Sequence, residues 1–182
     1  MSHLPLWYTA QLGDEMCDQV VLDLIPVEAR EATMGVDGEQ TNVATRKTKV
    51  HFAESGYWLE GIFERFAMEA NKTCKWDYHI TGMECIQFAE YEVGHHYTWH
   101  TDTFTLSGKP EDRKITVVCL LNDAFQGGDF EVRLYNDYNA QLKKGSMIAF
   151  PSILEHRVTP ITEGFRYSAT MWLNGQIGRA HV

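Results

Sequence analysis

Two histidines and an aspartate have the types and the spacing of metal ligands. His100 and Asp102 lie two residues apart in a segment that reads as an extended strand. Side chains at positions i and i+2 of a strand point to the same face, so one imidazole and one carboxylate can meet at a single point. His156, which follows a turn-like Phe-Pro-Ser sequence at 150–152, offers the third ligand. Together the three residues predict a metal site.

Divalent iron suits this set of ligands. Two imidazoles and one carboxylate on one face of an iron leave the opposite positions open, and that arrangement is typical of non-haem Fe(II) oxygenases. A co-substrate and O₂ can fill the open positions. We predict no catalytic side chain beyond the metal ligands.

A buried cation is predicted beside the metal. Arg166 lies ten residues beyond His156, and Ser168 follows two residues later on the same face of the strand. A buried guanidinium needs an anionic partner, because an unpaired buried charge is very costly. Arginine grips a carboxylate with two parallel hydrogen bonds. A dicarboxylate that chelates the metal at one end and meets Arg166 and Ser168 at the other fits both features; a surface salt bridge is the alternative for Arg166.

Length and composition favour one compact domain. The chain has 182 residues, of which 44% are hydrophobic and 23% charged, values that are ordinary for a soluble globular protein. We see no apolar run of membrane-spanning length and no secretory signal, and therefore expect no membrane partner and a cytoplasmic location. The four cysteines are scattered and read as reduced core residues.

The charge balance argues against nucleic acid as a partner. The net charge is −9, whereas nucleic-acid binders usually carry a basic stripe. The densest basic stretch, Thr-Arg-Lys-Thr-Lys at 45–49, reads more readily as a solvated loop or strand edge than as a binding patch.

The order of elements predicts a mainly β fold with flanking N-terminal helices. Apolar residues at three- and four-residue steps predict helices at 14–24 and 55–76, a loop at 31–42 and a short strand within 43–52. Short apolar runs between turn signals then predict strands, which suit a double-stranded β-helix (jelly roll). We expect a single domain over 1–182, with a helical or mixed flank and lid at 1–80 and a jelly-roll catalytic core at 81–175. The predicted strands are 83–91, 97–102, 114–121, 129–135, 146–150, 155–159 and 165–173.

The motifs, in their order, resemble a known family. The sequence is similar to the 2-oxoglutarate and Fe(II)-dependent oxygenases of the prolyl 4-hydroxylase type, whose single-domain members occur in bacteria and phages. The resemblance covers nearly half of the chain, from about Tyr91 to Trp172. A phage member would work in the cytoplasm of its host. The anchors are His-Thr-Asp at 100–102, Leu-Asn at 121–122, Gly-Gly-Asp-Phe at 127–130, Phe-Pro-Ser at 150–152, His156 and Gly-x-Arg-x-Ser at 164–168.

The resemblance implies cofactors and residue roles. It implies Fe(II), 2-oxoglutarate as co-substrate, O₂, and ascorbate as reductant. It implies that the distal carboxylate of 2-oxoglutarate is bound by Arg166, with Ser168 assisting, and that Tyr91 donates a hydrogen bond to the co-substrate. Arg113 and Trp172 match positions that contact substrate in some relatives.

The sequence departs from the family at one position, and it carries two extra histidines. Many prolyl hydroxylases have a tyrosine where this chain has Leu120, so Arg166 and Ser168 would carry more of the co-substrate binding. His95 and His96 are expected to be loop residues near the mouth, solvated or facing substrate. The polar segment 31–49 is expected to fold over the mouth as a lid.

The leading hypothesis is prolyl 4-hydroxylation of a peptide or protein. The alternative with the same chemistry is a hydroxylase of a free amino acid or another small molecule. A cupin-like metal enzyme that is not an oxygenase would usually add a third histidine and a glutamate at fixed spacing, and we find no such pattern in the sequence. A non-enzymatic metal-binding protein would have little use for Arg166. The oligomeric state is left open.

Overall fold

Two larger packed sheets, a two-stranded sheet and two helices make up the regular structure of the described residues. The computed structural model describes residues 6–32, 44–103, 111–133 and 135–176. Among these residues the large sheet has eight strands. Seven lie in the order β1 (Tyr8–Gln11), β12 (Ser146–Pro151), β8 (Glu111–Leu120), β15 (Arg166–Gln176), β6 (Gln87–Tyr91), β4 (Lys49–Phe52) and β2 (Arg30–Glu31), and β5 (Ile80–Met83) pairs with β15.

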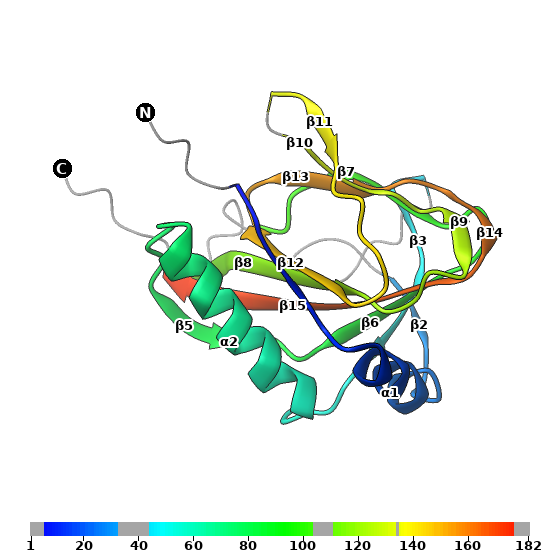
Figure 1. The fold of residues 1–182 in the computed structure, drawn as a ribbon, viewed down its shortest axis with the longest axis horizontal. Coiled ribbons are helices and arrows are strands. Elements are labelled where there is room, and N and C mark those ends of the chain that lie inside the picture. The colour runs from blue at the N-terminus through cyan, green and yellow to red at the C-terminus, as the bar shows by residue number, and fades with distance from the viewer. Residues whose placement is uncertain (1–5, 33–43, 104–110, 134, 177–182) are drawn as a thin grey trace.

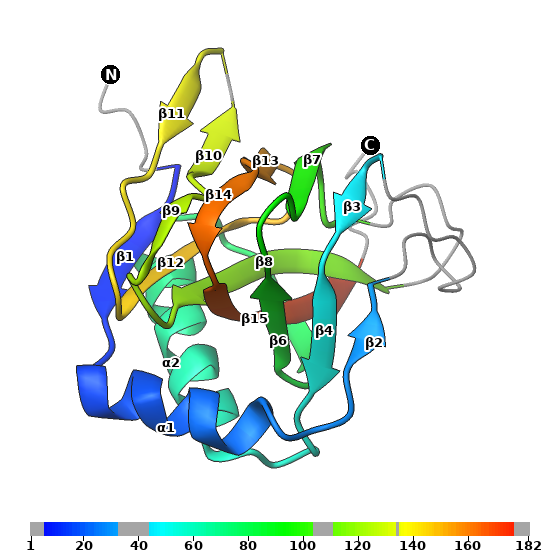
Figure 2. The same cartoon turned by 90° about the vertical axis from the view of Figure 1, so that its right-hand side faces the viewer.

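A smaller sheet faces the large one, as Figure 2 shows. It has five strands in the described residues, in the order β11 (Asp137–Asn139), β10 (Phe130–Arg133), β13 (Glu155–Val158), β7 (His96–His100) and β3 (Arg46–Lys47). A two-stranded sheet of β14 (Ile161–Gly164) and β9 (Phe125–Gly127) lies at one end (Figure 1).

The two helices cover the face of the large sheet that points away from the small one (Figures 1 and 2). They are α1 (Asp14–Leu24) and α2 (Trp58–Thr73). In α2 the buried apolar residues Leu59, Phe63 and Phe66 recur at helical spacing, so one side of the helix is apolar. The helix ends before Lys75, whose φ of 54° is left-handed and cannot continue it.

The central strands present different side chains to the two layers, because residues alternate between the faces of a strand. On β8 and β15 one set packs against the helices, and it consists of Ile115, Val117, Cys119, Ala169, Met171 and Leu173. The residues between them face the small sheet. That second set includes Thr116, Val118, Arg166, Ser168 and Trp172, so most of its members are polar or aromatic rather than aliphatic. The site is therefore expected between the sheets.

The predicted mainly β fold with N-terminal helices is confirmed. The helices predicted at 14–24 and 55–76 correspond to α1 and α2, and every predicted strand overlaps an observed one. Short strands were missed, because two to four residues carry too little periodic signal. The segment before residue 80 does more than flank the core, since β1 pairs with β12, β4 with β6 and β3 with β7.

Much of the predicted lid and loop lies outside the described residues, which exclude 33–43. Of the remainder, Arg46–Lys47 form β3 at the edge of the small sheet, and β4 begins at Lys49. None of the described helices has the length and hydropathy needed to cross a membrane.

The packing of α2 on the large sheet can be tested at Phe63, which is fully buried. We expect Phe63→Ala to lower the free energy of unfolding by about 3–5 kcal/mol, because it leaves a cavity between helix and sheet. Met68→Ala, on the exposed side of the same helix, should change it by less than about 0.5 kcal/mol. Urea denaturation measures both, and equal losses would contradict this packing.

Candidate metal centre

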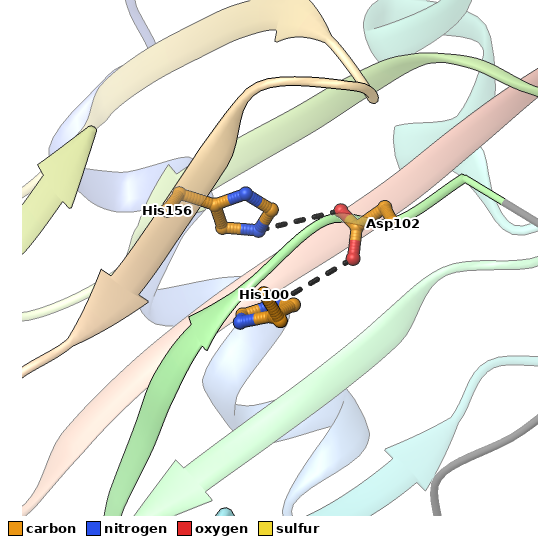
Figure 3. Close-up of side chains that lie close together, drawn as sticks. All are labelled: His100, Asp102 and His156. Atoms are coloured by element: carbon orange, nitrogen blue, oxygen red, sulfur yellow. Dashed lines mark ion pairs between the residues drawn. The ribbon is translucent and has the colours of Figure 1, made fainter. Parts of the chain in front are cut away.

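The structure brings His100, Asp102 and His156 together (Figure 3). One potential ligand atom from each lies within 4.8 Å of the others. Asp102 Oδ1 is 3.6 Å from His100 Nε2, and Asp102 Oδ2 is 3.4 Å from His156 Nε2. The two histidines are direct cross-strand partners on β7 and β13. Antiparallel pairing thus joins two residues that are far apart in the sequence.

Both imidazoles are held in the tautomer that a metal needs. His100 Nδ1 is 2.8 Å from the carbonyl oxygen of Thr98, and His156 Nδ1 is 3.0 Å from that of Leu154. A carbonyl oxygen only accepts hydrogen bonds, so each Nδ1 must carry the proton and donate. In the neutral form of each ring, Nε2 is then the nitrogen that carries the free lone pair. Such bonds to backbone carbonyls are the usual support of metal-bound histidine.

The charges at the site also suit a cation. Burial, together with the neighbouring His156, lowers the pKa of His100 to about 3. Burial by itself would raise the pKa of Asp102, but His156, His100 and the Trp172 hydrogen bond outweigh it and bring that pKa to about 2. At neutral pH His100 is therefore neutral and Asp102 ionised, which are the states in which these groups bind metals.

Asp102 accepts two further hydrogen bonds at one of its oxygens. Thr116 Oγ1 donates to Asp102 Oδ2 at 2.8 Å, and Trp172 Nε1 donates to the same oxygen at 2.9 Å. Both donors are buried. The sequence analysis did not single out Thr116. A polar residue within the apolar run 115–121 was the signal that could have found it.

The two residues predicted to contact substrate lie next to each other. The guanidinium of Arg113 stacks over the Trp172 ring at 3.7 Å from its centroid. Arg113 also forms a two-bond ion pair with Glu84, at 2.6 and 2.5 Å. Trp172 is 7% exposed. The substrate roles of both residues stay predictions, but their main contacts here are with Asp102, Glu84 and each other.

Arg166 is a buried cation, as predicted. It is 1% exposed, so the alternative of a surface salt bridge is wrong. Its Nη1 donates to Ser168 Oγ at 3.2 Å, and its Nε has no hydrogen-bond partner in the described part of the chain. Its guanidinium carbon lies 5.4 Å from the centroid of the Tyr91 ring, and Tyr91 is its cross-strand partner on β6. Burial lowers the pKa of Arg166. Among the described residues, no carboxylate forms an ion pair with it.

Gly128 makes room for the Arg166 side chain. A Cβ at this glycine would lie 2.9 Å from Arg166 Cδ and 2.4 Å from Ile161 Cδ1, and its φ of +65° is left-handed. Both the space and the backbone conformation therefore require glycine. This accounts for the second glycine of the Gly-Gly-Asp-Phe motif.

The Tyr97 ring covers His100, and the Arg46 guanidinium lies over Tyr97. Tyr97 stacks on His100, with ring centroids 3.4 Å apart and an interplanar angle of 12°. The Arg46 guanidinium lies 4.6 Å above the Tyr97 ring. Burial raises the pKa of Tyr97 to about 12 despite Arg46, and Tyr91 adds to the rise. The stretch 45–49 does form a strand edge, as predicted, but Arg46 Nε is buried and lacks a hydrogen-bond partner.

The two additional histidines differ in environment. His95 is a loop residue, as expected, but it is 7% exposed and therefore not solvated. Its backbone bonds to Glu92 and Ile161 hold it inward. That His95 faces substrate stays a prediction. His96 begins β7, so the expectation of a loop residue is wrong for it. His96 is partly exposed, and its ring nitrogens lie 3.2 Å from the carbonyl oxygens of Gly94 and Ala44. Neither belongs to the ligand cluster.

Comparison with known proteins shows where the chain belongs. Residues 86–174 match the model of the 2OG-Fe(II) oxygenase superfamily. A PKHD-type hydroxylase of Thermosynechococcus vestitus is 35% identical over 96 residues, which are 50% of this chain and 42% of that protein. A PKHD-type hydroxylase of Shewanella sp. is 30% identical over 95 residues, which are likewise 50% of this chain and 42% of that protein. The chain thus covers less than half the length of these relatives.

Solved structures share the fold over most of the chain. A prolyl hydroxylase from Trichoplax adhaerens, solved with a peptide fragment of hypoxia inducible factor, has a TM-score of 0.75 at 19% identity and covers 92% of this chain and 83% of its own. A Pseudomonas putida prolyl-4-hydroxylase has a TM-score of 0.70 at 16% identity, over 92% of both chains.

The segment 86–174, which contains the three candidate ligands and Arg166, belongs to the 2OG-Fe(II) oxygenase superfamily. Proteins of this superfamily use Fe(II), 2-oxoglutarate and O₂. The family predicted from the motifs is confirmed, and its solved fold neighbours include prolyl 4-hydroxylases, the predicted type.

The burial of Arg166 without a carboxylate has a cost that can be measured. We expect Arg166→Met to raise the free energy of unfolding by about 1–4 kcal/mol in protein free of metal and co-substrate, because it removes a desolvated charge at similar volume. Arg133→Met, which removes a half-exposed arginine paired with Asp137, should lower it by less than about 1 kcal/mol. Urea denaturation compares them. A large loss at Arg166 would mean that the protein itself satisfies this guanidinium.

Proposed function

We propose that the protein is a 2-oxoglutarate-dependent dioxygenase that hydroxylates a C–H bond, with Fe(II) held by His100, Asp102 and His156. The observation that carries the proposal is the donor set: two bare imidazole nitrogens and one ionised carboxylate within 4.8 Å of one another. Three protein ligands leave half of the coordination positions of iron to other groups, as non-haem oxygenases require.

The surroundings of Arg166 fit the co-substrate. Arg166 Nε is buried without a hydrogen-bond partner from the residues that the structure describes, and Ser168 lies beside it. A dicarboxylate would supply the missing anion, with Arg166 and Ser168 binding its distal carboxylate. Tyr91, which is 4% exposed and next to Arg166, is proposed to donate to the same molecule. When bound, Fe(II) and 2-oxoglutarate would supply the activation of O₂ that C–H hydroxylation needs.

The protein's own part is to orient groups and exclude water. Phe150 packs edge-on against His156 at 4.9 Å between ring centroids, and Phe130 lies 5.7 Å away. Tyr97 covers His100. These rings keep bulk water from one side of the ligands and fix the planes of both imidazoles. A dry, rigid site keeps the bound oxidant close to its intended target.

We also propose that the two facing sheets form one double-stranded β-helix, and that the chain is a single domain. The shared fold with the prolyl hydroxylases supports this. The pairing of N-terminal strands with both sheets supports a single unit, because neither sheet is complete without them.

The proposed substrate is a proline residue of a peptide or protein. Support comes from the fold neighbours, which are described as prolyl hydroxylases, one of them solved with a peptide. A viral neighbour from Paramecium Bursaria Chlorella virus-1, with a TM-score of 0.69, is described as a collagen prolyl hydroxylase. A free amino acid is the alternative substrate.

The three ligands can be tested one at a time. We expect His100→Ala, Asp102→Ala and His156→Ala each to reduce succinate formation from 2-oxoglutarate to background, because two ligands hold iron poorly. His96→Ala, which removes a neighbouring imidazole outside the cluster, should keep wild-type turnover. Succinate is measured by mass spectrometry with iron, ascorbate and O₂ present. Wild-type turnover in all three ligand variants would remove the metal hypothesis.

The substrate class is tested with the wild-type protein. Proline-containing peptides and free amino acids are incubated separately with Fe(II), ascorbate and 2-oxoglutarate, and their masses are measured. We expect a gain of one oxygen on a prolyl residue, and none when Arg166→Ala replaces the wild type. Oxygen gained only by a free amino acid would favour the alternative substrate.

A further inference from the structure

We propose that Trp172 and Thr116 are positioning residues that restrict Asp102 to binding iron through Oδ1 alone. The inference rests on the proposed iron site and adds to it the groups that decide how the carboxylate can bind. It assigns to Trp172 a contact with a metal ligand, where the sequence suggested a contact with substrate.

The two oxygens of Asp102 have different surroundings. Oδ2 accepts from Thr116 Oγ1 at 2.8 Å and from Trp172 Nε1 at 2.9 Å, and both are ordinary hydrogen-bond lengths. Two donors occupy both in-plane lone pairs of a carboxylate oxygen. Oδ1 has no such donor among the described residues, and it lies 3.6 Å from His100 Nε2. Oδ1 is therefore the oxygen with a lone pair to give to a cation.

The direction of the Thr116 bond follows from the charge of Asp102, and it determines the role of Ser152. Thr116 has one hydroxyl proton, and an ionised Asp102 can only accept, so Thr116 must donate to it. The Ser152 hydroxyl, 2.9 Å from Thr116 Oγ1, is then the donor to Thr116. Ser152 also accepts the backbone N–H of Asp102 at its own carbonyl, at 2.9 Å. Ser152, which is fully buried, thus holds both the backbone and the side chain of Asp102 in place.

The Trp172 ring is fixed from its other side. Arg113 stacks on the ring at 3.7 Å, and Glu84 holds Arg113 with two hydrogen bonds. The indole therefore cannot rotate without losing its stack on Arg113 and its hydrogen bond to Asp102. Glu84, Arg113 and Trp172 form a chain that ends on Asp102 Oδ2, opposite the chain from Ser152 through Thr116.

The chemical consequence concerns the number of open positions on the metal. A carboxylate can bind a cation through one oxygen or through both. Binding through both would take a position that the proposed reaction needs for co-substrate or O₂. Donors on Oδ2 prevent this, because that oxygen would have to give up two buried hydrogen bonds, leaving two buried polar groups unsatisfied.

The test uses Mn(II) as the probe, with four single variants and one double variant of the full chain. Thr116→Val removes the hydroxyl at nearly constant volume, Thr116→Ser retains it, and Trp172→Phe removes the indole N–H. Trp58→Phe is the matched control, since Trp58 Nε1 donates to Asp23 Oδ2 at 3.3 Å far from the site. Mn(II) affinity is measured by competition with a chelator, and the coordination of Asp102 by crystal structures of the Mn(II)-loaded proteins.

We expect Oδ1 alone to bind Mn(II) in the wild type. Thr116→Val and Trp172→Phe should each weaken Mn(II) binding by about 10–100-fold, the usual effect of losing an outer-shell partner. Thr116→Ser and Trp58→Phe should bind as the wild type does. In the double variant Thr116→Val/Trp172→Phe, Asp102 should bind through both oxygens.

Several outcomes would overturn the inference. Coordination through Oδ2 in the wild type would do so. A double variant that binds Mn(II) as tightly as the wild type, and still through one oxygen of Asp102, would do so too. If Thr116→Ser were as weak as Thr116→Val, the loss would reflect packing and not the hydroxyl. Absence of Mn(II) binding by the wild type would instead refute the metal site itself, and the inference with it.

Discussion

The ionised carboxylate of Asp102 is the constraint on which the rest of the site depends. A buried charge is tolerated only when other groups compensate for it. Here one hydroxyl, an indole and two imidazoles lie around an aspartate that is 8% exposed, and the Ser152 hydroxyl supports the first hydroxyl, that of Thr116. These side chains come from β7, β8, β13, β15 and the turn that follows β12. Both sheets must therefore be in place before the charge of Asp102 is compensated. The fold and the site therefore form together.

On the large sheet, the side chains that stabilise the fold and those that form the site lie on opposite faces, because side chains alternate along each strand. Its outer face is aliphatic and packs on α1 and α2, while its inner face carries Thr116, Arg166, Ser168 and Trp172. The helices can thus stabilise the sheet without contacting the site. The inner face in turn holds polar groups that an ordinary core would exclude. Arg166 is the clearest case, because no described residue forms a hydrogen bond with its buried Nε. Such a buried, uncompensated charge lowers the stability of the fold, and its use is to bind an anionic ligand.

Much of this could be predicted from residue types and short spacings. Strand alternation predicted that Arg166 and Ser168 share a face, and both lie on β15. It also predicted His100 and Asp102 on one face of a strand at 97–102. The observed β7 ends at His100, and the backbone of Asp102 bonds instead to Ser152. Helical periodicity placed α1 and α2. Other features had no local signal. Strands such as β2 and β3 have two residues each, and they form only because a neighbouring strand supplies their hydrogen bonds. The burial of His95 likewise depends on a backbone contact with Ile161, far along the chain.

The sequence by itself determined which atoms are available: two imidazoles, one carboxylate and one guanidinium at spacings that strands make productive. Only the tertiary structure decided which lone pairs remain free. It placed Thr98 and Leu154 carbonyls at each Nδ1, and Thr116 and Trp172 at Asp102 Oδ2. It also turned Trp172 and Arg113 toward each other. The physical reason is that a hydrogen bond depends on distance and direction between groups from different strands, and spacing along one strand does not specify either.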